Sequence, residues 1–122
     1  MIFHYPLATA IPVEPEEGKY LRGVHGQGND LVVGCSNGKV LVFDCSAGIK
    51  SGQFSLLHTL EAGKHPISAI STSKSWLAAG DDFGNVYLYS IRDAYAQAAV
   101  FRGNGIPCTS VAVSEHVVIA GY

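Results

Sequence analysis

Hydrophobic residues along the chain fall into short runs that are separated by turns rich in Gly, Ser, Asn and Asp. Residues 31–33, 40–43, 86–89 and 117–120 are apolar at consecutive positions rather than at every second position. A sheet with one face in water would alternate apolar and polar residues, whereas continuous apolar runs indicate strands covered on both faces. The pattern therefore predicts an all-β protein whose sheets stack face against face.

Four strands are expected in each unit of this architecture, because Val, Ile, Leu, Phe and Tyr dominate the segments between the turns. The turns carry "SNG" (36–38) and "DFG" (82–84), in which Gly can adopt a positive φ and Asn or Asp can bond its own backbone. The stretch "SIRDAYAQAAV" (90–100) has helix-like composition. Its place between strands predicts a connecting loop, and a helical turn there is the alternative. The first strands are expected near Val24, at 67–72 and at 109–113; the second at 31–33, 77–79 and 117–120; the third at 39–43 and 85–89; the fourth at 54–60 and 97–101.

The chain repeats itself. A step of 46 residues carries Leu31 onto Leu77, and a step of 41 carries residues 65–80 onto 106–121 without a gap. The difference between the two steps is expected to lie in "SAGIKSGQ" (46–53), which has the composition of a loop. A repeat with fixed strands tolerates insertions in its loops, so the chain holds two complete units and the start of a third.

A repeating unit of about 40 to 45 residues with four strands resembles the WD-repeat β-propeller family. Phe43-Asp44 and Tyr89-Ser90 stand where the family places an aromatic residue and an Asp at the end of the third strand. The segment "AGKHPI" (62–67) stands at the Gly-His pair that opens a repeat. The positions that match the repeat motif, including the turn aspartate, are Phe43, Asp44, Gly63, His65, Asp82 and Tyr89.

The motif is degenerate. No Trp occupies the dipeptide position, since Trp76 begins a second strand, and Ser36 replaces the turn aspartate in the first unit. Ala78 and Ala79 stand where the family has a hydroxyl in the second strand. Of the family's hydrogen-bonded tetrad, only His65 and Asp82 could therefore pair here.

The resemblance implies a partial WD-repeat β-propeller of about two and a half four-stranded blades. Residues 1–18 are expected to end a preceding blade and to include a linker, 19–61 and 62–103 to form two blades, and 104–122 to form the first two strands of a further blade. Closed propellers have about 4 to 8 blades, so further blades, from the same polypeptide or from another chain, are expected to bury the end faces.

Composition and charge narrow the classes of partner. Apolar residues make up 48% of the chain and charged residues 15%, which excludes a disordered protein. The net charge is -2 and the Lys and Arg residues are scattered, so nucleic acid is not an expected partner. No apolar run approaches the roughly 20 residues that span a bilayer, so membrane insertion is not expected either.

The cysteines and the N-terminal residues bear on the compartment. Three widely spaced cysteines, Cys35, Cys45 and Cys108, indicate small buried hydrophobic residues in a reducing, cytoplasmic environment. The segment "ATA" (8–10) resembles a signal-peptide cleavage site, but no basic region precedes it and Pro6 and Pro12 break the apolar stretch. We therefore expect an intracellular protein.

Catalytic and metal-binding interpretations are weaker than structural ones at every candidate position. His65 with Asp82 could be an acid-base pair, but a hydrogen bond between a turn and a strand is the simpler interpretation. Cys35 could be a nucleophile, but it ends an apolar strand where a small buried residue is expected. The histidines and cysteines lack metal-ligand spacing, Asp81 and Asp82 lack further oxygen ligands for calcium, and strands follow the Gly-rich segments 25–30 and 102–107, where a phosphate site would need a helix. No cofactor or metal is expected.

Propellers expose loops at the rim of a rigid ring, and such loops commonly bind peptides or proteins. We therefore expect a non-catalytic scaffold for protein interactions. The alternatives are part of a propeller enzyme whose catalytic residues lie in blades outside this chain, and a small β-sandwich complete in itself, against which the continuous apolar runs argue. The expected partner-binding residues lie in four loops on one rim: Ser36, Asn37, Lys64, His65, Asp81, Asp82, Phe83, Arg102 and Asn104.

A partial propeller would expose an apolar face at each end of the array. We expect the isolated chain to self-associate, with sedimentation velocity showing species larger than a 12.9 kDa monomer. A stable and well-dispersed monomer would argue for the β-sandwich instead.

Overall fold

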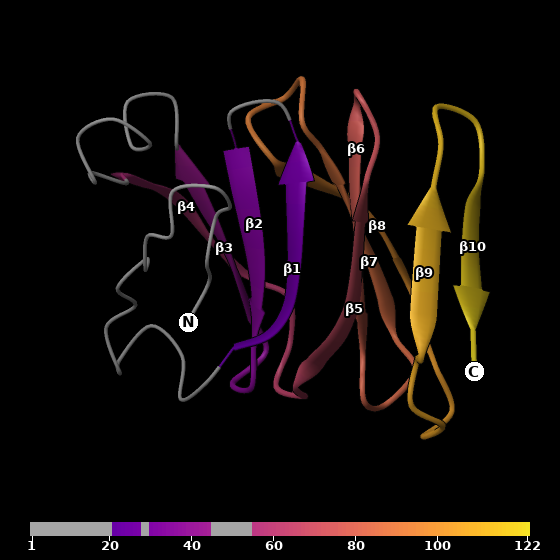
Figure 1. Ribbon diagram of the computed structural model, residues 1–122. Coiled ribbons are helices and arrows are strands. Elements are labelled where there is room, and N and C mark those ends of the chain that lie inside the picture. Colours follow the sequence, from indigo (N-terminus) through magenta and orange to yellow (C-terminus); the bar gives the residue numbers. More distant parts are fainter. Residues whose placement is uncertain (1–20, 28–29, 45–54) are drawn as a thin grey trace, which may run out of the picture.

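The computed structural model describes residues 21–27, 30–44 and 55–122, and these residues form ten strands and no helix (Figure 1). The expected end of a preceding blade (1–18), Cys45 and the expected loop 46–53 lie outside the described residues. The strands are β1 (Leu21–Gln27), β2 (Asp30–Cys35), β3 (Lys39–Asp44), β4 (Ser55–Glu61), β5 (Ile67–Thr72), β6 (Trp76–Asp81), β7 (Val86–Ser90), β8 (Ala96–Phe101), β9 (Ser110–Val113) and β10 (Val118–Gly121).

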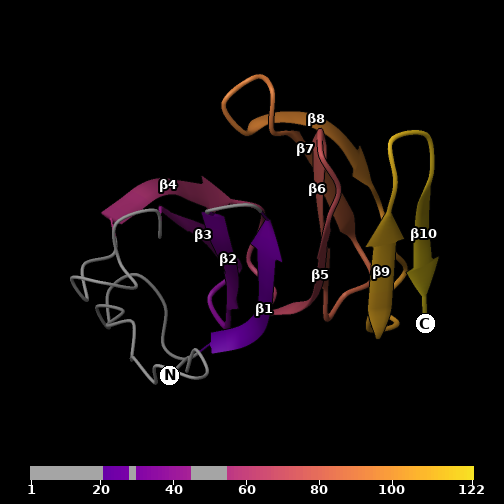
Figure 2. The same ribbon diagram turned by 45° about the horizontal axis from the view of Figure 1, so that its top comes forward.

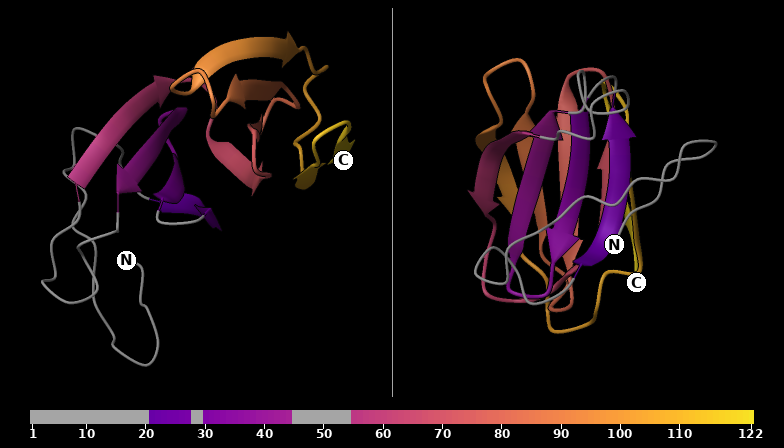
Figure 3. Two further views of the ribbon diagram at one scale, coloured as in Figure 1. Left: turned by 90° about the horizontal axis from the view of Figure 1, so that it is seen from above. Right: turned by 60° about the vertical axis from the view of Figure 1, so that its left-hand side comes forward.

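The strands pair as antiparallel meanders. The first sheet has the order β1-β2-β3-β4, the second has the order β5-β6-β7-β8, and β9 pairs with β10 alone among the described residues. Seen from above, the three sheets follow one another along an arc, with β4 and β8 on its outer side (Figures 2 and 3). β1 contacts β5, and β5 contacts β9, so the first strands of successive sheets are neighbours. This arrangement confirms the expected all-β, partial-propeller fold.

The two sheets share their irregularities as well as their strands. The β1-β2 pairing shifts register between Leu21 and Gly23, and the β5-β6 pairing shifts between Ile67 and Ala69, 46 positions later. The third and fourth strands also shift at matching places, between Val42 and Phe43 and between Leu88 and Tyr89. The sequence repeat is therefore a structural repeat down to single bulges.

The middle strands of both full sheets are buried on both faces. β2 and β3 each have four consecutive buried residues, and β6 has five. The outer strands differ: Leu56 and Leu57 in β4 are 42% and 47% exposed, and most of β8 is exposed. The continuous apolar runs predicted this contrast, because only a strand between two neighbouring sheets buries consecutive side chains.

The core between the first two sheets is built from one face of each. Val32 and Val42 of the first sheet cluster with Leu77, Ala79 and Tyr89 of the second, and all are nearly inaccessible to solvent. Full burial of each aliphatic side chain contributes about 1.5–3 kcal/mol to folding. This apolar layer is therefore the main attachment between the two sheets.

Two glycines let neighbouring sheets approach closely. A Cβ atom on Gly34 of β2 would collide with the side chain of Ile67, which opens the next sheet. A Cβ atom on Gly80 of β6 would collide with the side chain of Cys108, which precedes β9. These two positions correspond in the 46-residue repeat, so each second strand uses a glycine to accept the sheet that follows it.

Polar contacts also join neighbouring sheets, at the end of the strands opposite Gly34 and Gly80. The Tyr95 hydroxyl donates to Asp30 at 2.8 Å, and burial is the main cause that raises the pKa of Tyr95 above its ordinary value. The Glu115 carboxylate accepts hydrogen bonds from the hydroxyls of Ser75 at 2.6 Å and Ser73 at 2.7 Å. Those bonds, with Ser75 contributing more, hold the pKa of Glu115 below its usual range.

The helix-like stretch after β7 forms a turn and then a strand. Residues 91–95 make the turn, and the alanine-rich remainder pairs with β7 as strand β8. Ala94 and Tyr95 have positive φ values of 56° and 62°, a conformation that is uncommon outside Gly, Asn and Asp. Burial of the Tyr95 ring and its bond to Asp30 offset this strain, so tertiary contacts override the local helix preference.

The inter-sheet layer predicts a clear difference between two leucines. Leu77→Ala, which empties a fully buried position, should lower the free energy of unfolding by about 2–5 kcal/mol. The control Leu57→Ala, at a half-exposed position of β4, should lower it by less than about 1 kcal/mol. Urea denaturation followed by far-UV circular dichroism measures both. Equal losses would show that packing between the faces of the sheets does not account for the stability of the fold.

Candidate functional site

Four loops meet at one end of the strands, at the bottom of the view in Figure 1. The Gly63 amide donates to the Gly38 carbonyl at 3.4 Å and joins the β4-β5 loop to the β2-β3 turn. The Gly105 amide donates to the Phe83 carbonyl at 2.9 Å and joins the β8-β9 loop to the β6-β7 turn. Backbone bonds thus hold together the loops that the sequence places on one rim.

Glycine is required at the tips of both turns. Gly38 and Gly84 have φ values of 86° and 89°, which L-residues rarely adopt. A Cβ atom on Gly38 would collide with the Gly63 carbonyl, and one on Gly84 with the Ile106 carbonyl. The turn glycines therefore permit both the positive φ and the close packing of the neighbouring loop.

Asp81, the last residue of β6, organises the β6-β7 turn. One carboxylate oxygen accepts from the amides of Phe83 and Asn85, each at 2.9 Å. The other accepts from the Asn85 side chain at 3.0 Å and from the Tyr87 hydroxyl at 2.9 Å. The side chain of Asp81 has no solvent exposure. Four donors thus compensate a buried carboxylate, as burial of a charge requires.

Tyr87 and Asn85 extend this network toward the next loop. Burial first, and then the hydrogen bond to Asp81, raise the pKa of Tyr87 to about 12, so its hydroxyl stays protonated and donates at neutral pH. The Asn85 side-chain oxygen accepts from the Gly103 amide at 2.9 Å. The sequence placed both residues in the expected third strand (85–89) and expected neither at the rim. Their spacing, four and six residues after Asp81, was the signal in the sequence that could have identified them as its partners.

The structure corrects the assignment of the two aspartates. The sequence placed Asp82 at the structural turn position and Asp81 with it among the partner-binding residues. Asp81 holds the turn instead, and its complete burial removes it from the partner-accessible surface. Asp82 is half-buried, and its amide donates to the Pro66 carbonyl at 3.0 Å. The side-chain bond between His65 and Asp82 remains a prediction.

The loops line an open pocket of about 340 Å³, whose lining includes Asn85 and Tyr87 of the Asp81 network. Four predicted rim residues, from three different loops, come together there. His65 and Phe83 stack with their ring centroids 4.8 Å apart and their planes inclined by 14°. The pocket is lined by Ala62, Gly63, Lys64, His65, Phe83, Asn85, Tyr87, Arg102 and Gly103.

The other expected rim residues lie outside this pocket. Ser36 and Asn37 are half-buried in the β2-β3 turn, where the Asn37 side-chain oxygen accepts from the Lys39 amide at 3.1 Å. Asn104 is exposed in the β8-β9 loop. Among the repeat-motif residues, Phe43 and Tyr89 are 5% and 4% exposed, in β3 and β7. Those two aromatic side chains belong to the core.

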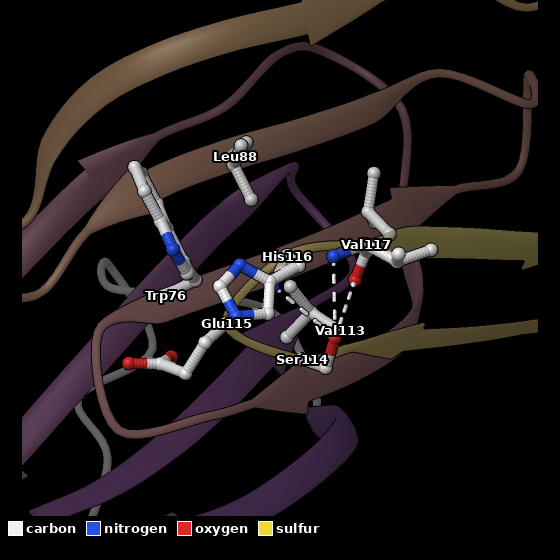
Figure 4. Close-up of a pocket in the computed structure, with 8 residues that line it drawn as sticks. Trp76, Leu88, Val113, Ser114, Glu115, His116 and Val117 are labelled. Carbon is white, nitrogen blue, oxygen red and sulfur yellow. Dashed lines mark hydrogen bonds between the residues drawn. The ribbon is translucent and has the colours of Figure 1, made fainter.

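A second, apolar pocket of about 160 Å³ lies at the opposite end of the strands (Figure 4). Trp76 and Leu88 of the second sheet face the turn that joins β9 to β10, with Val113 and Val117 nearby. Val117 and Ile119 are 54% and 64% exposed. This end of the array therefore presents apolar surface to solvent.

The described residues offer few candidates for catalysis or metal binding. In these ranges, no three His, Cys, Asp or Glu side chains gather as metal ligands would. Among the described residues, Cys35 and Cys108 are both buried and no disulfide joins them. No helix long and apolar enough to cross a membrane occurs in residues 21–27, 30–44 and 55–122.

Comparison of sequences relates the chain to one group of proteins. No protein-family model matches the chain. It is 28% identical over 129 residues to WD repeat-containing protein 54 from Homo sapiens, an alignment that covers 100% of this chain and 38% of that protein. Its identity to the protein of that name from Mus musculus is 27% over 113 residues, covering 87% of this chain and 33% of the relative. The chain thus spans little more than a third of the length of these relatives, and the expected WD-repeat resemblance is confirmed.

Comparison of structures identifies the fold. A chain in the crystal structure of the Mitotic Checkpoint Complex matches with a TM-score of 0.65 and 22% identity, over 76% of this chain and 27% of that one. The computationally designed Ika8 matches at 0.70 and 22% identity, over 83% of this chain and 30% of its own. The designed Ika4 matches at 0.68 and 23% identity, over 83% of this chain and 59% of its own. These neighbours are propellers, so the sheets of this chain have the form of propeller blades.

The hydrogen-bond network predicts which aspartate supports the rim. Asp81→Ala would leave the Tyr87 hydroxyl and the donors of Asn85 without their buried acceptor, and it should destabilise the fold by about 3 kcal/mol or more. Asp82→Ala, at the half-buried neighbouring position, should cost distinctly less. Chemical denaturation of both variants measures the difference. A larger loss in Asp82→Ala would restore the assignment made from the sequence.

Proposed function

We propose that this chain is part of a non-catalytic scaffold that binds protein or peptide partners through its rim loops. The observation that carries the proposal is the convergence of Lys64, His65, Phe83 and Arg102 around one pocket. Phe83 is 43% exposed although it is a large apolar side chain, and it stacks on His65. Aromatic and arginine side chains at the centre of a surface commonly contribute most to the affinity for a protein partner.

The geometry of the rim supports binding more than catalysis. The buried carboxylate of Asp81 has four hydrogen-bond donors and no solvent contact, so it has no access to a substrate. Cys35 is fully buried, so its thiol cannot attack a substrate either. What the rim offers is a rigid support for exposed side chains, which is the usual basis of recognition by loops.

The similarity to WD-repeat proteins supports the same proposal at a coarser level, since WD-repeat propellers generally bind proteins. We further propose that residues 19–61, 62–103 and 104–122 act as successive blades. In this proposal additional blades, from the same polypeptide or from another chain, cover the apolar end around Leu88 and Val117 (Figure 4). Burial of Cys35 and Cys108 without a disulfide between them supports a reducing intracellular location.

The exposed Phe83 ring provides the direct test of the rim proposal. Affinity capture from a cell extract, quantified by mass spectrometry, should recover a reproducible set of proteins with the unaltered chain. Phe83→Ala should reduce that recovery about tenfold or more, because an anchor residue at an interface typically contributes over 1.4 kcal/mol.

The matched control is Leu57→Ala, because Leu57 is 47% exposed and Phe83 is 43% exposed, but Leu57 lies on β4 away from the rim. Circular dichroism should be unchanged in both variants. Equal recovery by the two variants would exclude the Phe83 surface as the contact, and loss in Leu57→Ala alone would move the contact to the outer strand.

A further inference from the structure

The rim pocket has a distinctive charge pattern. Two of its nine lining residues, Lys64 and Arg102, carry a positive charge at neutral pH, and none of the nine is acidic. The two cations come from different loops, which the backbone bonds of Gly63 and Gly105 hold in place. A partner group entering the pocket therefore meets two positive charges and no negative one among the lining side chains.

Asp81 and Asp82, which flank the lining residue Phe83 in the chain, do not line the pocket. Asp81 is bonded to the lining residues Asn85 and Tyr87, and no part of it reaches solvent. Asp82 is half-buried in the neighbouring turn and does not line the pocket. Arg102 and Tyr87 both line the pocket.

Two glycines let the loops pack closely around the pocket. A Cβ atom on Gly63 would collide with the Tyr87 hydroxyl, so glycine lets the β4-β5 loop lie against that side chain. A Cβ atom on Gly103 would collide with the backbone of Gly84, so glycine there lets the β8-β9 loop lie against the β6-β7 turn.

An apolar surface, formed by Phe83 and Ile106, adjoins the two cationic residues of the pocket. The Phe83 ring is stacked on His65 and lies 3.7 Å from the position that a Cβ atom on Gly105 would occupy. Ile106, in the same loop as Gly105, is 52% exposed. Apolar and cationic surface thus lie side by side on one rim.

We propose that the rim pocket binds a peptide segment in which an Asp or Glu side chain lies next to an apolar residue. The carboxylate is held by Lys64 and Arg102, and the apolar residue rests on Phe83. This inference rests on the proposed function and names the chemistry of its partner. Charge-assisted hydrogen bonds from Lys and Arg to a carboxylate are stronger than neutral ones, and Arg can bind it through two parallel bonds.

A peptide fits these observations better than a nucleic acid does. A nucleic-acid groove follows a charged backbone with many cations and offers successive aromatic platforms. The pocket has two cations and one stacked pair, and the chain carries a net charge of -2. A volume of about 340 Å³ has room for one or two side chains.

The test is selection of a phage-displayed library of random dodecapeptides against the immobilised full chain, followed by sequencing and by affinity measurement on synthetic copies of the enriched peptides. We expect enriched peptides to share an Asp or Glu beside an apolar residue. Their affinity should fall about tenfold or more in the double variant Lys64→Gln, Arg102→Gln. It should be largely retained in Lys64→Arg, Arg102→Lys, and it should weaken as the salt concentration rises.

The matched control is Arg92→Gln, which removes a positive charge from the exposed turn at the opposite end of β7 and should leave the affinity unchanged. If the enriched peptides carry no acidic residue, bind Phe83→Ala weakly and bind the double variant as tightly as the unaltered chain, the acidic preference is wrong. The rim proposal would stand in that case. Enrichment that is insensitive to Phe83→Ala, or no enrichment at all, would contradict both. Tighter, Lys64-dependent binding of an oligothymidylate probe would overturn the choice of a peptide.

Discussion

The fold depends on apolar contact between the faces of successive sheets. Val32 and Val42 on one side and Leu77 and Ala79 on the other are fully buried in this layer. No sheet could be stable alone with such strands, because each would expose continuous apolar surface to water. Gly34 and Gly80 bring the layers close enough to pack. The sequence repeats because successive sheets form the same kind of interface.

The rim depends on the same layer. β6 is buried along five of its six residues, and it ends in Asp81, so the carboxylate that organises the rim is held by a strand fixed on both faces. Asp81, Asn85 and the Gly103 amide then connect that strand to the following loop. The exposed side chains around the pocket are thus held on a rigid base, which limits the conformational entropy lost when a partner binds.

The elements that depend on local signals could be predicted from the sequence. The continuous runs predicted the buried strands, and the turn glycines predicted the positive φ at Gly38 and Gly84. The resemblance to WD-repeat propellers also predicted which loops share a rim. Strand pairing and turn geometry are decided over a few residues, so a repeated pattern reports them reliably.

Features that depend on contacts across the fold could not be predicted in the same way. Asp81 and Asp82 are adjacent in the sequence, but the side chains of Asn85 and Tyr87 both donate to Asp81, the one that is buried. Lys64 and Arg102 line one pocket because backbone bonds from Asp82 to Pro66 and from Gly105 to Phe83 attach both of their loops to the β6-β7 turn, a proximity that spacing alone does not determine. The loop expected after the third strand is confirmed, but the positive φ of Tyr95 and its bond to Asp30 of another sheet had no signal in the sequence.

Hydrogen exchange at individual backbone amides tests the central interaction most directly, because protection reports how each strand is held. Packing between the sheet faces predicts that β2, β3, β6 and β7 exchange slowest and as one group. The outer strands β4 and β8 should exchange faster. Strongest protection in β4 and β8, or fast exchange in β3 and β7 while the outer strands remain protected, would contradict packing between the sheet faces as the basis of the fold.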